Sequence, residues 1–138
     1  METESAGKLH IYRKENEKKV LIRTSDLQIG NNTVGRPSKE KPADIEIPND
    51  DYMSRRHFII DVYRDSRHNR LHYTLSDNHS RNGTFFYCEV SKSQHKLKTD
   101  DEVSVAKGDE IRAGKTYFRI ESVEEPPAKD TGTKENIF

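Results

Sequence analysis

The sequence predicts an all-β protein, folded as an antiparallel β-sandwich or barrel, because apolar and polar residues alternate along seven short segments. This alternation has a period of two, which places successive side chains on opposite faces of a strand and leaves one face to be buried. Turn-forming residues separate the segments at short intervals. No segment has an apolar stripe at helical spacing. Many short strands joined by turns are typical of sandwiches and barrels.

The expected strands follow one another along most of the chain. Their apolar residues are, in chain order, Leu9 and Ile11; Val20 and Ile22; Ile45 and Ile47; Phe58, Ile60 and Val62; Leu71, Tyr73 and Leu75; Val103 and Val105; and Phe118 and Ile120. The charged segment 13–19 separates the first two strands, and we expect it to form a hairpin turn. Gly, Asn, Asp and Ser predict further turns at 64–70, 76–83, 106–110 and 112–115.

The length of 138 residues fits one domain with a small core. We expect this domain to span residues 8–124, between a flexible tail at 1–7 and a second tail at 125–138 that is polar and rich in turn-forming residues. The single cysteine, Cys88, excludes a disulfide within the chain.

The charge balance argues against two classes of partner. Lys and Arg together number 24, as do Asp and Glu, so the chain has no net positive charge to attract nucleic acid or a membrane surface. The longest apolar run is only Phe85–Cys88, which is too short to span a membrane, and the first residues do not have the composition of a signal peptide. We therefore expect an intracellular protein, cytoplasmic or, in a eukaryote, nuclear.

Three loops nevertheless concentrate positive charge. Loop 34–41, segment 52–57 and loop 76–83 contain six Lys and Arg residues against two acidic residues. If the loops meet at one end of a sandwich, they form a cationic pocket, because sandwich ends are common binding sites. Arginine suits such a pocket, since the planar guanidinium pairs with two phosphate oxygens at once. Taken singly, a Gly-Arg turn, two adjacent arginines and an Asn-Gly turn are ordinary surface features.

The order and spacing of three short motifs in these loops are specific. They are Gly35-Arg36, Ser54-Arg55-Arg56-His57 and Asn82-Gly83-Thr84. This series resembles the forkhead-associated (FHA) domain, whose pattern is Gly-Arg, then Ser-x-x-His, then Asn-Gly. Supporting matches occur at Asp44-Ile45, Leu75-Ser76-Asp77, 108–111 and Gly114, so that the resemblance spans about residues 8–122.

The resemblance implies a fold and a function. The fold is an antiparallel β-sandwich of about eleven strands, FHA/SMAD-like, with its binding loops at one end. The partner is a phosphothreonine-containing protein or peptide, that is, the substrate of a kinase. The implied phosphate-binding residues are Arg36, Ser54, Arg55 and Arg81. Asn82 would bind the peptide backbone, and the residues that shape or brace the loops would be Gly35, His57, Gly83 and Thr84.

The sequence offers three alternatives to phosphopeptide binding. Ser54 and His57 suggest a nucleophile and a base, but alternation along a strand would separate them and no oxyanion loop is evident, so we expect no enzyme. His68 and His72 lie in an expected hairpin rather than on a helix face, so we expect no metal site, and we expect no cofactor. An FHA-type scaffold that binds its partner without phosphate remains the alternative function.

The expected tails suggest one further partner, which is the chain itself. Thr3, Thr131 and Thr133 lie in polar segments that a kinase could reach. Once phosphorylated, such a threonine would compete with other ligands for the chain's own pocket, since tethering raises its effective concentration.

Overall fold

The computed structural model describes residues 5–124, which form eleven β-strands and no helix. The strands are β1 (Gly7–Glu15), β2 (Lys18–Leu27), β3 (Gly30–Gly35), β4 (Ile45–Glu46), β5 (Phe58–Asp65), β6 (Arg70–Asp77), β7 (Thr84–Cys88), β8 (Ser93–Lys96), β9 (Glu102–Ser104), β10 (Glu110–Ala113) and β11 (Thr116–Glu121). The structure confirms the predicted all-β sandwich.

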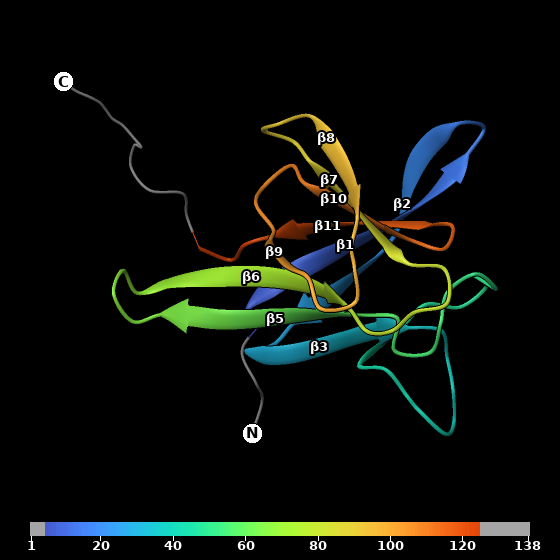
Figure 1. The fold of residues 1–138 in the computed structure, drawn as a ribbon, viewed down its shortest axis with the longest axis horizontal. Helices are drawn as coiled ribbons and strands as arrows, with labels where there is room; N and C mark the ends of the chain where they lie inside the picture. Colours follow the sequence, from blue (N-terminus) through green and yellow to red (C-terminus); the bar gives the residue numbers. More distant parts are fainter. Residues whose placement is uncertain (1–4, 125–138) are drawn as a thin grey trace.

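The strands form two sheets that lie face to face (Figure 1). One sheet has the order β2-β1-β11-β10-β7-β8 and the other the order β4-β3-β5-β6-β9. All pairs are antiparallel except β3 and β4, which run parallel, with Val34 opposite Ile45. Parallel neighbours need a long connection, and loop 36–44 provides it by leaving β3 and returning to the same edge. This excursion places loop 36–44 at the end of the sandwich.

The core lies between the two sheets and contains most of the alternating residues that the sequence singles out. All of them except Val20, Ile22 and Val103 are buried. Phe58 of one sheet packs edge-on against Phe118 of the other, with ring centroids 5.0 Å apart. The edge-to-face arrangement adds to the burial of apolar area, which is the main stabilising contribution in a domain of this size.

The prediction that β2 is half-buried is wrong for its first residues. Val20, Leu21 and Ile22 are 38%, 51% and 47% exposed. Strand β2 lies at the edge of its sheet, and the β1–β2 hairpin extends beyond the other sheet (Figure 1), so neither face of the strand is covered there. The turn of this hairpin is also shorter than expected, because only Asn16 and Glu17, both with positive φ, lie between the strands.

Several strands lack the alternation that would have predicted them. β3 begins with Gly30-Asn31-Asn32, and β8 consists of polar residues on an exposed hairpin. These segments become strands because their backbones pair with β5 and β7, respectively. The folded part also begins before residue 8, since Ala6 is buried and its N–H donates to the Leu27 carbonyl.

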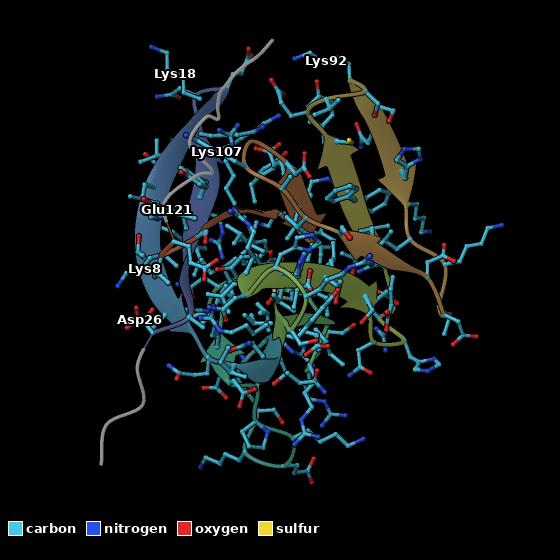
Figure 2. The ribbon with its side chains drawn as sticks, turned by 90° about the vertical axis from the view of Figure 1, so that its left-hand side faces the viewer. Lys8, Lys18, Asp26, Lys92, Lys107 and Glu121 are labelled. Atoms are coloured by element: carbon cyan, nitrogen blue, oxygen red, sulfur yellow. The ribbon has the colours of Figure 1, made fainter. Side chains whose placement is uncertain are left out.

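Charged side chains cover the outer surface of the first sheet (Figure 2). Lys8 and Asp26 on neighbouring strands form an exposed ion pair of 2.6 Å. Such pairs contribute little stability because solvent screens them. On this surface, positive and negative side chains therefore pair with one another, as Lys8 and Asp26 do.

Candidate functional site

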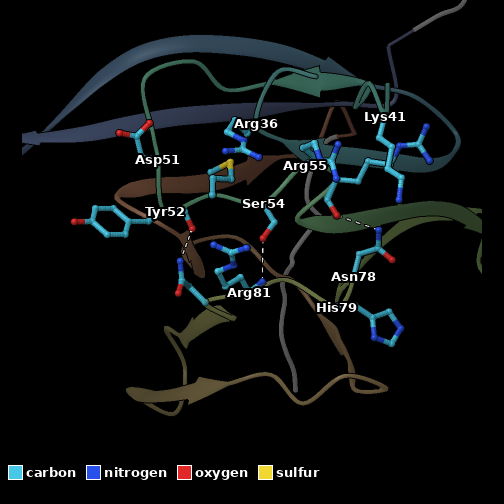
Figure 3. Close-up of a pocket in the computed structure, with 12 residues that line it drawn as sticks. Arg36, Lys41, Asp51, Tyr52, Ser54, Arg55, Asn78, His79 and Arg81 are labelled. Atoms are coloured by element: carbon cyan, nitrogen blue, oxygen red, sulfur yellow. Dashed lines mark hydrogen bonds between the residues drawn. The ribbon is translucent and has the colours of Figure 1, made fainter. Parts of the chain in front are cut away.

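Three loops meet at one end of the sandwich (Figure 1). They surround an open cavity of about 570 Å³, whose lining residues are drawn in Figure 3. The first loop follows β3, the second precedes β5, and the third joins β6 to β7. The cavity is lined by Arg36, Lys41, Asp51, Tyr52, Met53, Ser54, Arg55, Arg56, Asn78, His79, Arg81 and Asn82. The structure thus brings together all five residues that the sequence predicts to touch the phosphopeptide.

The cavity is strongly cationic. Five of its lining side chains are Lys or Arg, and one, Asp51, is acidic, which leaves a surplus of four positive charges. Like charges that line one cavity repel one another. An anionic ligand relieves the repulsion, so the arrangement suits an anion.

Gly35 allows two of the loops to touch. A Cβ atom at this position would lie 2.7 Å from the Ser54 carbonyl oxygen and would also collide with the Arg56 backbone nitrogen. Because no side chain intervenes, the Arg36 N–H donates to the Ser54 carbonyl at 3.0 Å. The group that approaches Gly35 is therefore the backbone of the chain's own second loop.

His57 is fully buried and joins the second and third loops. Its Nδ1 accepts the Ser54 N–H at 2.9 Å, and its Nε2 lies 2.8 Å from the Gly83 carbonyl oxygen. An N–H can only donate and a carbonyl can only accept, so the ring is neutral and holds its proton on Nε2. Burial lowers the pKa of His57 below its ordinary value, although Gly83 and the carboxylates of Asp77 and Asp50 oppose the shift.

Asp77 organises the third loop. Its carboxylate accepts hydrogen bonds from the Ser80 N–H, the Ser80 hydroxyl and the Thr84 hydroxyl, the last at 2.7 Å. Burial by itself raises the pKa of Asp77, but these hydrogen bonds outweigh it and hold the pKa below its ordinary value. Gly83 follows with a φ of +88°, a conformation that favours glycine.

Ser54 and Asn82 each retain a group that can bind a ligand. The Ser54 hydroxyl oxygen accepts the Arg81 N–H at 2.9 Å, which leaves its own hydrogen to donate (Figure 3). The Asn82 side-chain amide donates to the Tyr52 carbonyl at 2.8 Å, which leaves its oxygen to accept. The Arg81 amide is already used by Ser54, so only its side chain remains to contact an anion.

Arg55 and Arg56 lie in a turn and not in a strand. Strand β5 begins at Phe58, and Arg56 adopts a positive φ of 48°. Both residues line the cavity, although the family resemblance implies phosphate binding for Arg55 alone. Arg56 Nε donates to the Pro42 carbonyl at 3.0 Å and thereby ties the first loop to the second.

Asp50 is a buried residue of the site that sequence reasoning missed. Its carboxylate accepts hydrogen bonds from the Tyr52 N–H, the Lys115 N–H and the Thr116 hydroxyl, and thereby anchors the start of the second loop. A Cβ on Gly114 would lie 2.6 Å from that carboxylate. The spacing of 64 positions between Asp50 and Gly114 offers no local pattern that would have connected them.

The geometry does not support catalysis by Ser54 and His57. Both ring nitrogens of His57 are engaged with backbone groups, so neither is available to take a proton from the Ser54 hydroxyl. His68 and His72 both lie near Asp65, but residues 5–124 contain no group of His, Cys, Asp and Glu side chains arranged to hold a metal ion. No helix in this part of the chain is long and apolar enough to cross a membrane.

Comparison with known proteins connects this site to a family. The family model described as the FHA domain matches residues 32–114, a range that includes all three motifs. No curated protein sequence matches the chain.

Solved structures provide the second comparison. Yeast Pml1p has a TM-score of 0.66 at 23% identity, over 85% of this chain and 81% of that one. The FhaA FHA domain, solved with the intracellular domain of Rv3910, has a TM-score of 0.54 at 25% identity, over 83% and 98%. An FHA domain studied for phosphothreonine-dependent interactions has a TM-score of 0.54 at 24% identity, over 86% and 98%.

Proposed function

The chain belongs to the FHA domain family, and from this premise we propose that it binds a phosphothreonine-containing segment of a partner protein in the three-loop cavity. FHA domains are a family of binding modules rather than enzymes. The observation that supports the proposal is that Arg36, Ser54, Arg55 and Arg81 line a single cavity with a surplus of positive charge. A similar solved domain was studied for phosphothreonine-dependent interactions.

Each predicted residue has a role that its geometry suits. Arg36 and Arg55 offer guanidinium groups, which can pair with two phosphate oxygens each. Ser54 has a hydroxyl hydrogen to donate, because its oxygen already accepts the Arg81 N–H. Asn82 has a free side-chain oxygen that would accept a backbone N–H of the bound peptide.

The expected affinity follows from these contacts. A hydrogen bond to a charged group contributes about 1.5–3 kcal/mol, and the cavity offers three or four. Once the cost of association is subtracted, we expect a binding free energy of about -8 kcal/mol. This corresponds to a dissociation constant on the order of micromolar.

Replacing Arg36 by alanine tests the function. We expect binding of a phosphothreonine peptide library to weaken by about tenfold to a hundredfold, because one charge-assisted contact is lost. Fluorescence anisotropy with phosphothreonine, phosphoserine and unphosphorylated peptides measures the change. Arg67→Ala, in the exposed turn between β5 and β6, is the matched control because Arg67 does not line the cavity. Unaltered affinity in a folded Arg36→Ala protein would contradict the proposal.

We also propose that phosphorylated threonines of the chain itself compete for the cavity. The candidates Thr3, Thr131 and Thr133 lie outside the described residues. Peptides that contain them, synthesised with and without phosphate, should bind wild-type protein only when phosphorylated. If phosphorylation of the protein at these positions leaves binding of external peptides unchanged, self-binding does not occur.

The exposed edge of β2 favours a second candidate, a scaffold that binds its partner without phosphate. Val20, Leu21 and Ile22 are exposed on a free edge strand, and such an edge can pair with a strand of another protein. Among the solved relatives, yeast Pml1 is a splicing factor integrated into the RES complex. Partner binding that survives Arg36→Ala but is lost in Leu21→Lys would select this function.

A further inference from the structure

The cavity contains more positive charge than one phosphothreonine neutralises. A phosphate monoester carries a charge of about -1.5 to -2 at pH 7. Five cationic side chains and one acidic side chain line the cavity, so about two positive charges remain after the phosphate binds. We propose that Lys41 and Arg56, beside Arg55, form a second anion subsite, which binds a further acidic or phosphorylated residue of the same partner segment. This inference rests on the function proposed above.

The charges are distributed unevenly across the cavity. Figure 3 shows Arg36, Ser54 and Arg81 near its middle, with Tyr52 and Asp51 on one side and Lys41 and Arg55 on the other. Asp51, the acidic side chain that lines the cavity, thus lies away from Lys41 and Arg55. An extended peptide that places its phosphate at the middle continues over both sides, and only the side of Lys41 attracts a second anion.

Lys41 and Arg56, the two cations of the proposed subsite, are available to a ligand, as is Arg55 beside them. Lys41 Nζ has no hydrogen bond or ion pair with any described residue, and Arg56 uses only Nε, on the Pro42 carbonyl. Arg55 pairs with Glu40 at 3.3 Å, but the side chain of Glu40 is 86% exposed. An ion pair this exposed contributes little, so a ligand anion can displace it.

Hydrogen bonds fix the position of the first loop beside the proposed subsite. The hydrogen bond from Arg56 Nε to the Pro42 carbonyl joins loop 36–44 to the second loop. The Lys41 N–H in turn donates to the Ser38 hydroxyl at 3.1 Å, within a turn of the same loop. The backbone of Lys41 is therefore positioned before a ligand arrives, which reduces the entropy lost on binding.

Peptide pairs measure the subsite directly. One member contains a single phosphothreonine with neutral flanking residues, and the other contains in addition one aspartate or one phosphoserine, placed in turn at each position up to four residues before and after the phosphothreonine. We expect a gain of about tenfold in affinity at one or two neighbouring positions, all on one side of the phosphothreonine. Comparison of aspartate with phosphoserine distinguishes a carboxylate ligand from a second phosphate.

Two variants locate that gain. Lys41→Gln should reduce the ratio of the two affinities from about tenfold to about threefold, because one of the two cations is removed. Lys39→Gln is the matched control, since Lys39 is exposed on the same loop but does not line the cavity, and it should leave the ratio unchanged. The gain should also decrease as salt is added, as expected for exposed charges.

The outcomes are distinguishable. No gain at any position, or a gain that Lys41→Gln and Lys39→Gln reduce equally, would overturn the second subsite while phosphothreonine binding stands. If the singly phosphorylated peptide fails to bind wild-type protein, or binds Arg36→Ala as well as wild type, the proposed function itself fails and the subsite fails with it.

Discussion

Replacing His57 by alanine should destabilise the protein and disrupt the site together. The imidazole is fully buried and joins the Ser54 N–H to the Gly83 carbonyl. Removing the ring leaves two partners unsatisfied, and each costs about 1–3 kcal/mol. With the cavity that the ring leaves added, the free energy of unfolding should decrease by about 3–6 kcal/mol. A small domain has only about 5–15 kcal/mol in total.

The same residue gives a pH dependence with a definite sign. The pKa of His57 is lowered in the folded protein, so the unfolded chain binds the proton more readily. The free energy of unfolding is therefore highest above about pH 6.5, the pKa of His57 in the unfolded chain. It decreases as the pH falls from there toward the lowered pKa of the folded protein. His57→Ala should therefore show a smaller decrease in stability below about pH 6.5 than wild type does.

Urea unfolding, followed by circular dichroism at several pH values, measures both effects. His79→Ala is the control, since His79 is exposed on the third loop. The free energy of unfolding of this variant should stay within about 0.5 kcal/mol of wild type. Nitrogen chemical shifts should independently show neutral His57 with its proton on Nε2. A loss below about 1 kcal/mol in His57→Ala, or a proton on Nδ1, would refute the bridging role.

Three further predictions concern the loop contact, an exposed ion pair and the ligand. Gly35→Ala should weaken phosphopeptide binding and lower the free energy of unfolding by about 1–3 kcal/mol, because the added methyl group meets the backbone of Ser54 and Arg56; unchanged thermal unfolding would argue against this contact. Hydrogen bonds from His68 and the Arg67 backbone lower the pKa of Asp65 to about 2, so its stabilisation is present above about pH 4 and lost as the pH falls toward 2; Asp65→Asn should flatten the stability profile in that interval only. Phosphopeptide binding should weaken below about pH 6, where the phosphate gains a proton, and a flat titration from pH 7 to 5 would count against a dianionic ligand.

The sequence was sufficient for the fold class and for the family. Alternation along Phe58–Val62 and Leu71–Leu75 predicts buried strands because the side-chain period of a strand is fixed by its backbone geometry. The three motifs identify the binding loops because their order and spacing can be read directly from the sequence. Neither signal depends on knowing which strands are neighbours.

Tertiary structure decided the burial of β2 and the existence of β3 and β8. Val20 and Ile22 show the same apolar–polar alternation as the buried strands, but their strand lies at the edge of its sheet and both side chains are exposed. The Gly-Asn-Asn of β3 and the polar β8 have no pattern, and only their partner strands make them extended. Burial and pairing are properties of the assembled sheets, so a local pattern cannot report them.

The same division holds at the site. Composition and motif order alone placed Arg36, Ser54, Arg55 and Arg81 in three loops, and family resemblance suggested their roles. Only the folded chain brings Lys41 into the same cavity and fixes the proton of His57 on Nε2. These features depend on contacts between residues far apart in the sequence, and such contacts form only once the two sheets have packed and their loops share one end.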